Sequence, residues 1–258
     1  MDNPLLYMID HKLQIQRVIT DTITNPPLSW SGDGQNLLFS SSLENQYKFS
    51  IYDLDISSGF VEEVPLLIPG NVNLQDPDWA PDKKKIAFVQ PGAPIPMIYI
   101  FNLENNNIDF LTTGYSPKWI KGRGELVFLK YMEGGKLIFG KDVWVGGKIT
   151  QIQVDGQAET QISPDIISSK LSISPDGNRV VIQEITPNAQ LWKINSQETI
   201  DLPISFNSSY EPTWTLDGKS LLYADECILK LLNVSTKISQ RIEGLPEGYC
   251  YLYAAVQP

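Results

Sequence analysis

The chain contains 258 residues, of which 42% are hydrophobic, so it can bury the core of one large domain or two small ones. Its 20 Lys and Arg residues face 30 Asp and Glu residues, and the net charge of −10 argues against a nucleic-acid partner and favours a basic one. The longest apolar run near the start, residues 5–9, is too short to span a bilayer or to act as a signal peptide.

The first twenty residues contain two short runs of β-forming residues, 5–10 and 13–19, and His11 lies between them. No turn motif precedes them. Their pattern is that of the second half of the repeat that follows.

A short motif then occurs five times along the chain. Its anchors, 40 to 54 residues apart, are Trp30, Trp79, Trp119, Ile173 and Trp214. Each anchor leads through a turn such as Ser31-Gly32-Asp33-Gly34 into an apolar run. Asp-Gly between apolar runs predicts a β-hairpin, because Gly tolerates positive φ and Asp accepts bonds from nearby amides. We therefore interpret the repeated aspartates (Asp33, Asp82, Asp176 and Asp217) as turn formers rather than calcium ligands, and the anchors as core residues.

A third and a fourth strand follow in each unit. The predicted third strands are residues 50–55, 98–103, 149–155, 190–195 and 228–233, and a fourth strand is typified by residues 238–242. Four antiparallel strands repeating at this interval predict an all-β propeller rather than a sandwich. Nothing in the chain has convincing helical periodicity.

The two chain ends are expected to complete the ring. Residues 4–20 would supply two strands of a sixth blade, and the β-rich run 249–256 would supply the rest, which pairs otherwise exposed edges. Dividing 258 residues by six gives 43 per blade, within the usual range. We thus predict a six-bladed propeller of four-stranded antiparallel blades spanning residues 1–258 as a single domain.

The repeat Trp-Ser-x-Asp-Gly followed by an apolar run resembles that of the TolB-type six-bladed β-propellers, over essentially the whole chain. The resemblance implies a bacterial binding protein for protein partners; related propellers also cap serine peptidases or form polysaccharide lyases. From this sequence we do not expect the α/β domain that precedes the propeller of TolB, and Gly122-Arg123 departs from the turn motif.

Residues with chemical roles are sparse. His11 is the single histidine and no nucleophile-elbow motif accompanies it, so a Ser-His-Asp triad is not expected. One His with Cys227 and Cys250 cannot make a zinc site, and no phosphate-binding loop is present. We expect no catalytic residue, metal or cofactor. The two cysteines are expected to be buried thiols, with a disulfide as the alternative if the protein is exported.

The repeat register predicts that one end of the channel is the binding face. The connections between blades share a rim with the loops between second and third strands, for which we expect irregular segments such as 114–118 and 131–147. Residues three positions before the anchors should surround the channel mouth, with tyrosines nearby. The candidate binding residues are Asp76, Tyr115, Ser116, Lys170, Tyr210 and Glu211, and their acid excess suggests a ligand with a basic residue.

Two functions remain open. The first is a non-catalytic module that recognises a protein or peptide at this rim; the second is a hydrolase, a lyase or the accessory domain of one, acting on peptide or glycan with carboxylates. We expect a monomer without membrane insertion. Its compartment is periplasmic or extracytoplasmic if a leader was removed, and cytoplasmic otherwise.

Overall fold

The computed structural model describes residues 6–9, 15–20, 24–42, 49–68, 73–92, 95–139, 142–156, 158–168, 170–183, 188–204, 211–245 and 255–257. All regular elements in this part of the chain are β-strands paired antiparallel to their neighbours. Within the same residues no helix has the length and apolar character needed to cross a membrane. The all-β expectation is confirmed.

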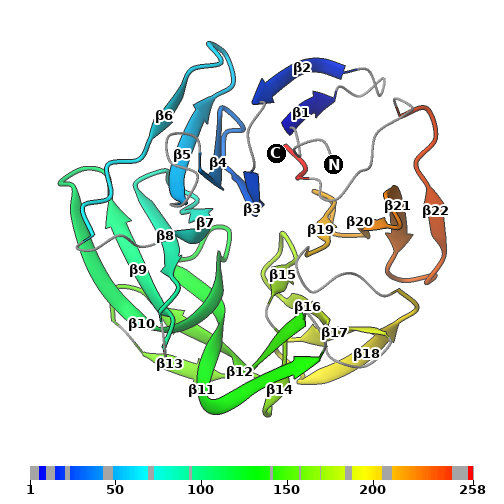
Figure 1. The fold of residues 1–258 in the computed structure, drawn as a ribbon. Helices are drawn as coiled ribbons and strands as arrows, with labels where there is room; N and C mark the ends of the chain where they lie inside the picture. Colours follow the sequence, from blue (N-terminus) through cyan, green and yellow to red (C-terminus); the bar gives the residue numbers. More distant parts are fainter. Residues whose placement is uncertain are drawn as a thin grey trace.

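The strands form antiparallel units arranged around a central axis (Figure 1). Three are separate four-stranded sheets, β3 to β6, β15 to β18 and β19 to β22. Two more share one sheet, because the long strand β10 pairs with β9 through residues 107–113 and with β11 through residues 114–119. In chain order the strands of these units are β3 (Thr24–Trp30), β4 (Asn36–Ser41), β5 (Ser50–Asp55), β6 (Val61–Glu63), β7 (Gln75–Trp79), β8 (Lys85–Gln90), β9 (Met97–Asn102), β10 (Asn107–Trp119), β11 (Glu125–Phe139), β12 (Asp142–Gln153), β13 (Glu159–Gln161), β14 (Ile166–Ile167), β15 (Leu171–Ile173), β16 (Arg179–Gln183), β17 (Ala189–Lys193), β18 (Glu198–Leu202), β19 (Thr213–Trp214), β20 (Ser220–Asp225), β21 (Ile228–Asn233) and β22 (Ser239–Arg241).

The N-terminal segment forms a separate two-stranded sheet. β1 (Leu6–Ile9) pairs antiparallel with β2 (Ile15–Thr20), as the sequence predicts for that segment. Figure 1 shows this pair in the sector between β3 and the β19 to β22 sheet, beside the C-terminal residues. The predicted C-terminal strand falls mostly outside the described residues.

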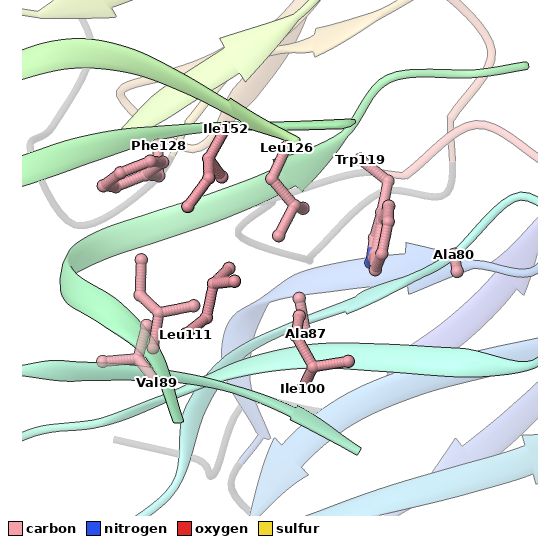
Figure 2. Packing of buried hydrophobic residues seen from close by; sticks show 10 residues of the cluster. Ala80, Ala87, Val89, Ile100, Leu111, Trp119, Leu126, Phe128 and Ile152 are labelled. Carbon is pink, nitrogen blue, oxygen red and sulfur yellow. The ribbon is translucent and has the colours of Figure 1, made fainter. Parts of the chain in front are cut away.

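The anchor residues pack between units. Trp119 lies in a buried cluster with Ala80, Ala87 and Ile100 of the preceding unit and with Leu126 of its own (Figure 2). The other interfaces repeat this arrangement, with Trp79, Ile173 and Trp214 each in a cluster that includes residues of the preceding unit. The interpretation of the anchors as core residues is confirmed at these positions, and apolar burial holds adjacent units face to face.

In four of the units, an aspartate in the first hairpin stabilises the turn. Asp33 accepts a bond from the Ser31 hydroxyl, with 2.7 Å between the oxygens, and another from the amide of Gln35. These bonds, with that from Lys83, lower the pKa of Asp33 to about 2. Asp82, Asp176 and Asp217 accept the corresponding amide bond, which confirms their interpretation as turn formers.

Three local expectations need correction. Residues 114–118, expected as a loop, belong to β10, and most of segment 131–147 is a paired extension of the β11 to β12 hairpin, since its apolar residues 137–139 and 143–145 favour strands. Cys227 is exposed and disulfide-bonded rather than a buried thiol, because it lies in the tight turn between β20 and β21. Cys250 and His11 lie outside the described residues.

Candidate functional site

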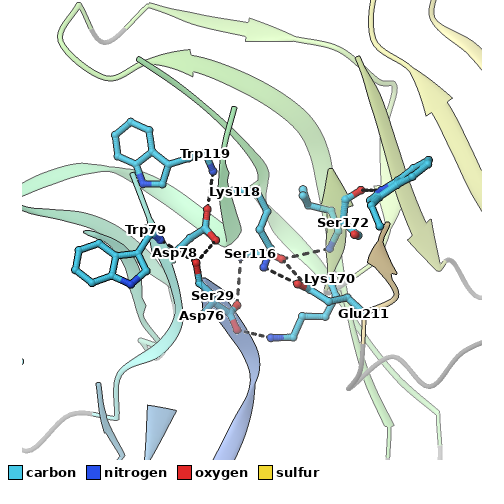
Figure 3. Close-up of polar contacts among 12 residues, drawn as sticks. Ser29, Asp76, Asp78, Trp79, Ser116, Lys118, Trp119, Lys170, Ser172 and Glu211 are labelled. Carbon is cyan, nitrogen blue, oxygen red and sulfur yellow. Dashed lines mark hydrogen bonds and ion pairs between the residues drawn. The ribbon is translucent and has the colours of Figure 1, made fainter. Parts of the chain in front are cut away.

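Four of the predicted site residues meet at the channel. Asp76 lies in β7 and Ser116 in β10, while Lys170 and Glu211 come just before β15 and β19. The Ser116 amide donates to Asp76 Oδ2 at 3.3 Å, and its hydroxyl donates to Glu211 Oε2 at 3.5 Å. Lys170 forms an ion pair with Asp76 (Figure 3). The repeat register therefore placed residues from four successive units correctly beside one another.

Two residues that the sequence reasoning missed complete this group. Lys118 forms an ion pair with Glu211, with 2.5 Å between Nζ and Oε1. Asp78 Oδ1 accepts from the Ser29 hydroxyl at 2.9 Å and Oδ2 accepts from the Trp119 amide at 2.7 Å, which links three units. Both lie two positions after a predicted site residue. The period of two along a strand could have identified them.

Burial and pairing change the expected electrostatics. Asp76 is 4% exposed and Glu211 is 7% exposed, so neither is a free carboxylate at an open mouth. Lys118 supplies a second cation and Asp78 a third acid, so the group holds three acids and two lysines rather than the predicted two acids and Lys170. Burial raises the pKa of both Glu211 and Asp78 above their usual values, although the nearby Lys118 acts in the opposite direction.

The backbone at Asp76 and Ser116 is strained. Their φ angles are 51° and 50°, and the strand register shifts at both places. Each is followed by a proline, Pro77 or Pro117, and neither is the glycine that this conformation favours. Such a residue costs on the order of 1–2 kcal/mol, which the surrounding bonds must offset.

A pair of tyrosines lies close to the strained residues. Tyr115 in β10 lies near Tyr131 in β11, with ring centroids 6.4 Å apart. Burial, followed by the neighbouring Tyr131, raises the pKa of Tyr115 to about 12, so the Tyr115 phenol remains a neutral hydrogen-bonding group at ordinary pH. Tyr210 lies outside the described residues.

In the described ranges, no three His, Cys, Asp or Glu side chains are grouped so that they could hold a metal ion. The arrangement instead provides two buried ion pairs, a serine bonded to both of their carboxylates, and adjacent tyrosines. Groups of these kinds can form hydrogen bonds and ion pairs with a ligand.

Comparison with known proteins identifies the class by fold. No protein-family model matches the chain, and no curated protein matches it in sequence. Among solved structures, TolB from Acinetobacter baumannii superposes with a TM-score of 0.69 at 16% identity over 89% of this chain. The chain spans 57% of that protein. The protein has the TolB-like β-propeller fold.

Two other solved structures share the fold. A chain of the nidogen/laminin complex gives a TM-score of 0.67 at 12% identity, covering 98% of this chain and 94% of that one. Oligogalacturonate lyase from Vibrio parahaemolyticus gives 0.55 at 14% identity, covering 93% and 85%. At such identities the similarity describes the architecture.

Proposed function

We propose that the protein is a six-bladed propeller, closed by both chain ends, that binds a protein or peptide segment as a monomer. The binding face is the rim where the units connect to one another, and it includes Asp76, Tyr115, Ser116, Lys170, Tyr210 and Glu211. Loops at this rim would make the outer contacts, while the buried group around Ser116 supports them from below.

The observation that carries the proposal is the strained backbone at Asp76 and Ser116. Both residues adopt positive φ without being glycine, and both participate in one group of hydrogen bonds and ion pairs. Strain of this kind concentrates at functional sites, because a protein that only needed to pack could relieve it with glycine.

The tyrosines favour a protein ligand. Tyr115 and Tyr131 offer large, rigid surfaces with a polar group, a residue type enriched where proteins bind one another. One structural neighbour comes from a nidogen/laminin complex, so a fold of this kind also occurs in an assembly of proteins. Lys118 and Lys170 already form ion pairs with Glu211 and Asp76. The ligand therefore does not need a basic residue to balance these two carboxylates.

The test begins with peptides selected from a random displayed library on the full chain. Dissociation constants of the selected peptides are then compared for wild type, Tyr131→Ala, Asp76→Asn and the control Asp217→Asn, which lies in a hairpin at the opposite end. We expect the two rim variants to bind at least tenfold more weakly and the control to bind normally. Equal weakening by Asp217→Asn, or none by the rim variants, would contradict the proposal.

The catalytic alternative rests on a specific pair of acids. Asp76 and Glu211 both bond to Ser116, and burial raises the pKa of Glu211, as a general acid requires. A lyase has the same fold. Oligogalacturonate and peptide substrates should therefore be incubated with the full chain. Turnover that disappears in Glu211→Gln but persists in Asp217→Asn would replace the binding proposal with this alternative.

A further inference from the structure

The channel contains a cavity of about 220 Å³ on the side away from the proposed rim. It begins at the level of Asp78, Lys118 and Glu211 and extends to Lys121 and Pro175 in the hairpins that follow the anchors. The first strands run from the rim to these hairpins, so the cavity opens toward the opposite end of the molecule. It shares Glu211 with the proposed rim, and its other lining residues lie beyond the rim residues.

The deep end of the cavity has an excess of negative charge. Asp78 and Glu211 line it together with one lysine, Lys118, whose ammonium is already paired with Glu211. Lys118 balances the charge of these two carboxylates only in part, and burial raises the pKa of both. A cation from a ligand would stabilise both ionised groups in surroundings where water does so poorly.

A polar group without a partner lies in the same wall. Ser172 is 7% exposed and lines the cavity, and its hydroxyl has no hydrogen-bond partner among the described residues. Its carbonyl is already occupied, since it accepts a bond from the Trp214 indole at 3.4 Å. The hydroxyl faces a wall of the cavity, so a ligand that donates to Ser172 would add a hydrogen bond there.

The remaining walls combine apolar residues with polar ones such as Ser174. Leu28, Trp119, Ile173 and Trp214 contribute to the lining. The volume of about 220 Å³ is below the roughly 300–1,000 Å³ of sites for drug-sized ligands. A small space with apolar side chains beside a charged end fits an unbranched aliphatic stem with a terminal donor group.

We propose that this end of the channel binds a primary ammonium group on an unbranched apolar stem, with the ammonium among Asp78, Glu211 and Ser172. The ligand is either a free alkylamine or the side chain of a lysine, which share this chemistry. A carboxylate at the other end of the stem strengthens binding through Lys121, an exposed residue of the cavity mouth with no ion-pair partner in the described part of the chain.

The test follows indole resonances in proton–nitrogen correlation spectra of the ¹⁵N-labelled full chain. Hexylamine, hexanol and hexanoate have the same stem and differ in the end group. We expect hexylamine to shift the Trp214 and Trp119 resonances in a saturable manner, hexanol to bind at least tenfold more weakly, and hexanoate to have no saturable effect. The Trp192 indole, which does not line the cavity, serves as an internal control.

Variants test each part of the cavity. Asp78→Asn should weaken hexylamine binding at least tenfold. Asp78 also accepts hydrogen bonds from Ser29 and Trp119, so this variant could disturb the fold. Ser172→Ala is a milder variant and should weaken hexylamine binding severalfold. We expect 6-aminohexanoate to bind more tightly than hexylamine. Lys121→Gln should remove that advantage, while Lys219→Gln, an exposed hairpin lysine outside the lining, should preserve it.

Nα-acetyl-lysine methylamide distinguishes the two sources. Binding at least as tight as that of hexylamine assigns the cavity to lysine side chains, whereas binding of hexylamine alone assigns it to free amines; either result supports the ammonium site. Equal shifts with hexanoate, or no saturable shift of Trp214 with any of the ammonium compounds, overturns it. Neither result depends on whether peptides bind at the rim.

Discussion

At the scale of single residues, the channel is unusual in the number of charges that it buries. Lys118 and Glu211 have side chains that are 10% and 5% exposed, and Asp76 pairs with Lys170 nearby. Such pairs contribute little net stability compared with apolar residues, because desolvation offsets much of their attraction. Losing one partner is a different matter, since it leaves the other charge buried and unbalanced.

We therefore predict strong coupling between Lys118 and Glu211. Glu211→Gln or Lys118→Met alone should lower the free energy of unfolding by about 3–5 kcal/mol, and the double variant should recover most of that loss. Urea denaturation of the four proteins in this cycle measures the coupling. Additive losses in the double variant would mean that the two side chains stabilise the fold independently.

At the scale of elements, the sequence was most informative where one residue type forces one geometry. The Asp-Gly turns predicted the first hairpins, and β5 and β21 have the predicted bounds, residues 50–55 and 228–233. The extension of β11 and β12 was not predicted, because residues 131–147 carry glycine pairs that are typical of loops, although residues 137–139 and 143–145 are apolar.

The hairpins also determine how closely adjacent units approach. A Cβ at Gly177, where φ is +69°, would lie 2.3 Å from Cγ2 of Ile120 in the preceding unit. At Gly122, with φ of +74°, a Cβ would meet nothing within 4 Å. The two glycines thus have the same backbone requirement and different space.

This pair provides a matched test of packing between units. Gly122→Ala should cost about 1–2 kcal/mol for the left-handed backbone alone. Gly177→Ala should cost a further 1–3 kcal/mol or so, because Ile120 must move. Thermal or urea unfolding of the two variants measures the difference, and equal losses would show that the hairpin of the later unit does not limit the approach.

At the scale of the whole molecule, repetition in the sequence predicted the arrangement of units because each unit meets the same environment on both faces. It predicted the meeting of Asp76, Ser116, Lys170 and Glu211 for the same reason. It did not predict how these side chains pair, since the partner of Glu211, Lys118, lies in a different unit 93 positions earlier. Register places residues around a ring, whereas ion pairing depends on side-chain reach.

Closure of the ring can be tested by deleting residues 1–20, which contain β1 and β2. We expect the melting temperature to fall by about 10 °C or more, because 1 kcal/mol corresponds to roughly 2–4 °C for a chain of this size. A chain with residues 1–20 scrambled should fall similarly, since it keeps length and composition. A truncated protein that melts within a few degrees of the full chain would mean that the ring closes without this segment.

The shared strand β10 gives the molecule one junction unlike the others. Elsewhere the chain leaves one sheet before it enters the next, but residues 107–119 continue from one unit into its neighbour as part of a single hydrogen-bonded sheet. A continuous strand cannot act as a hinge. The units on either side of β10 therefore move as one body, and any breathing of the channel must come from the junctions between separate sheets.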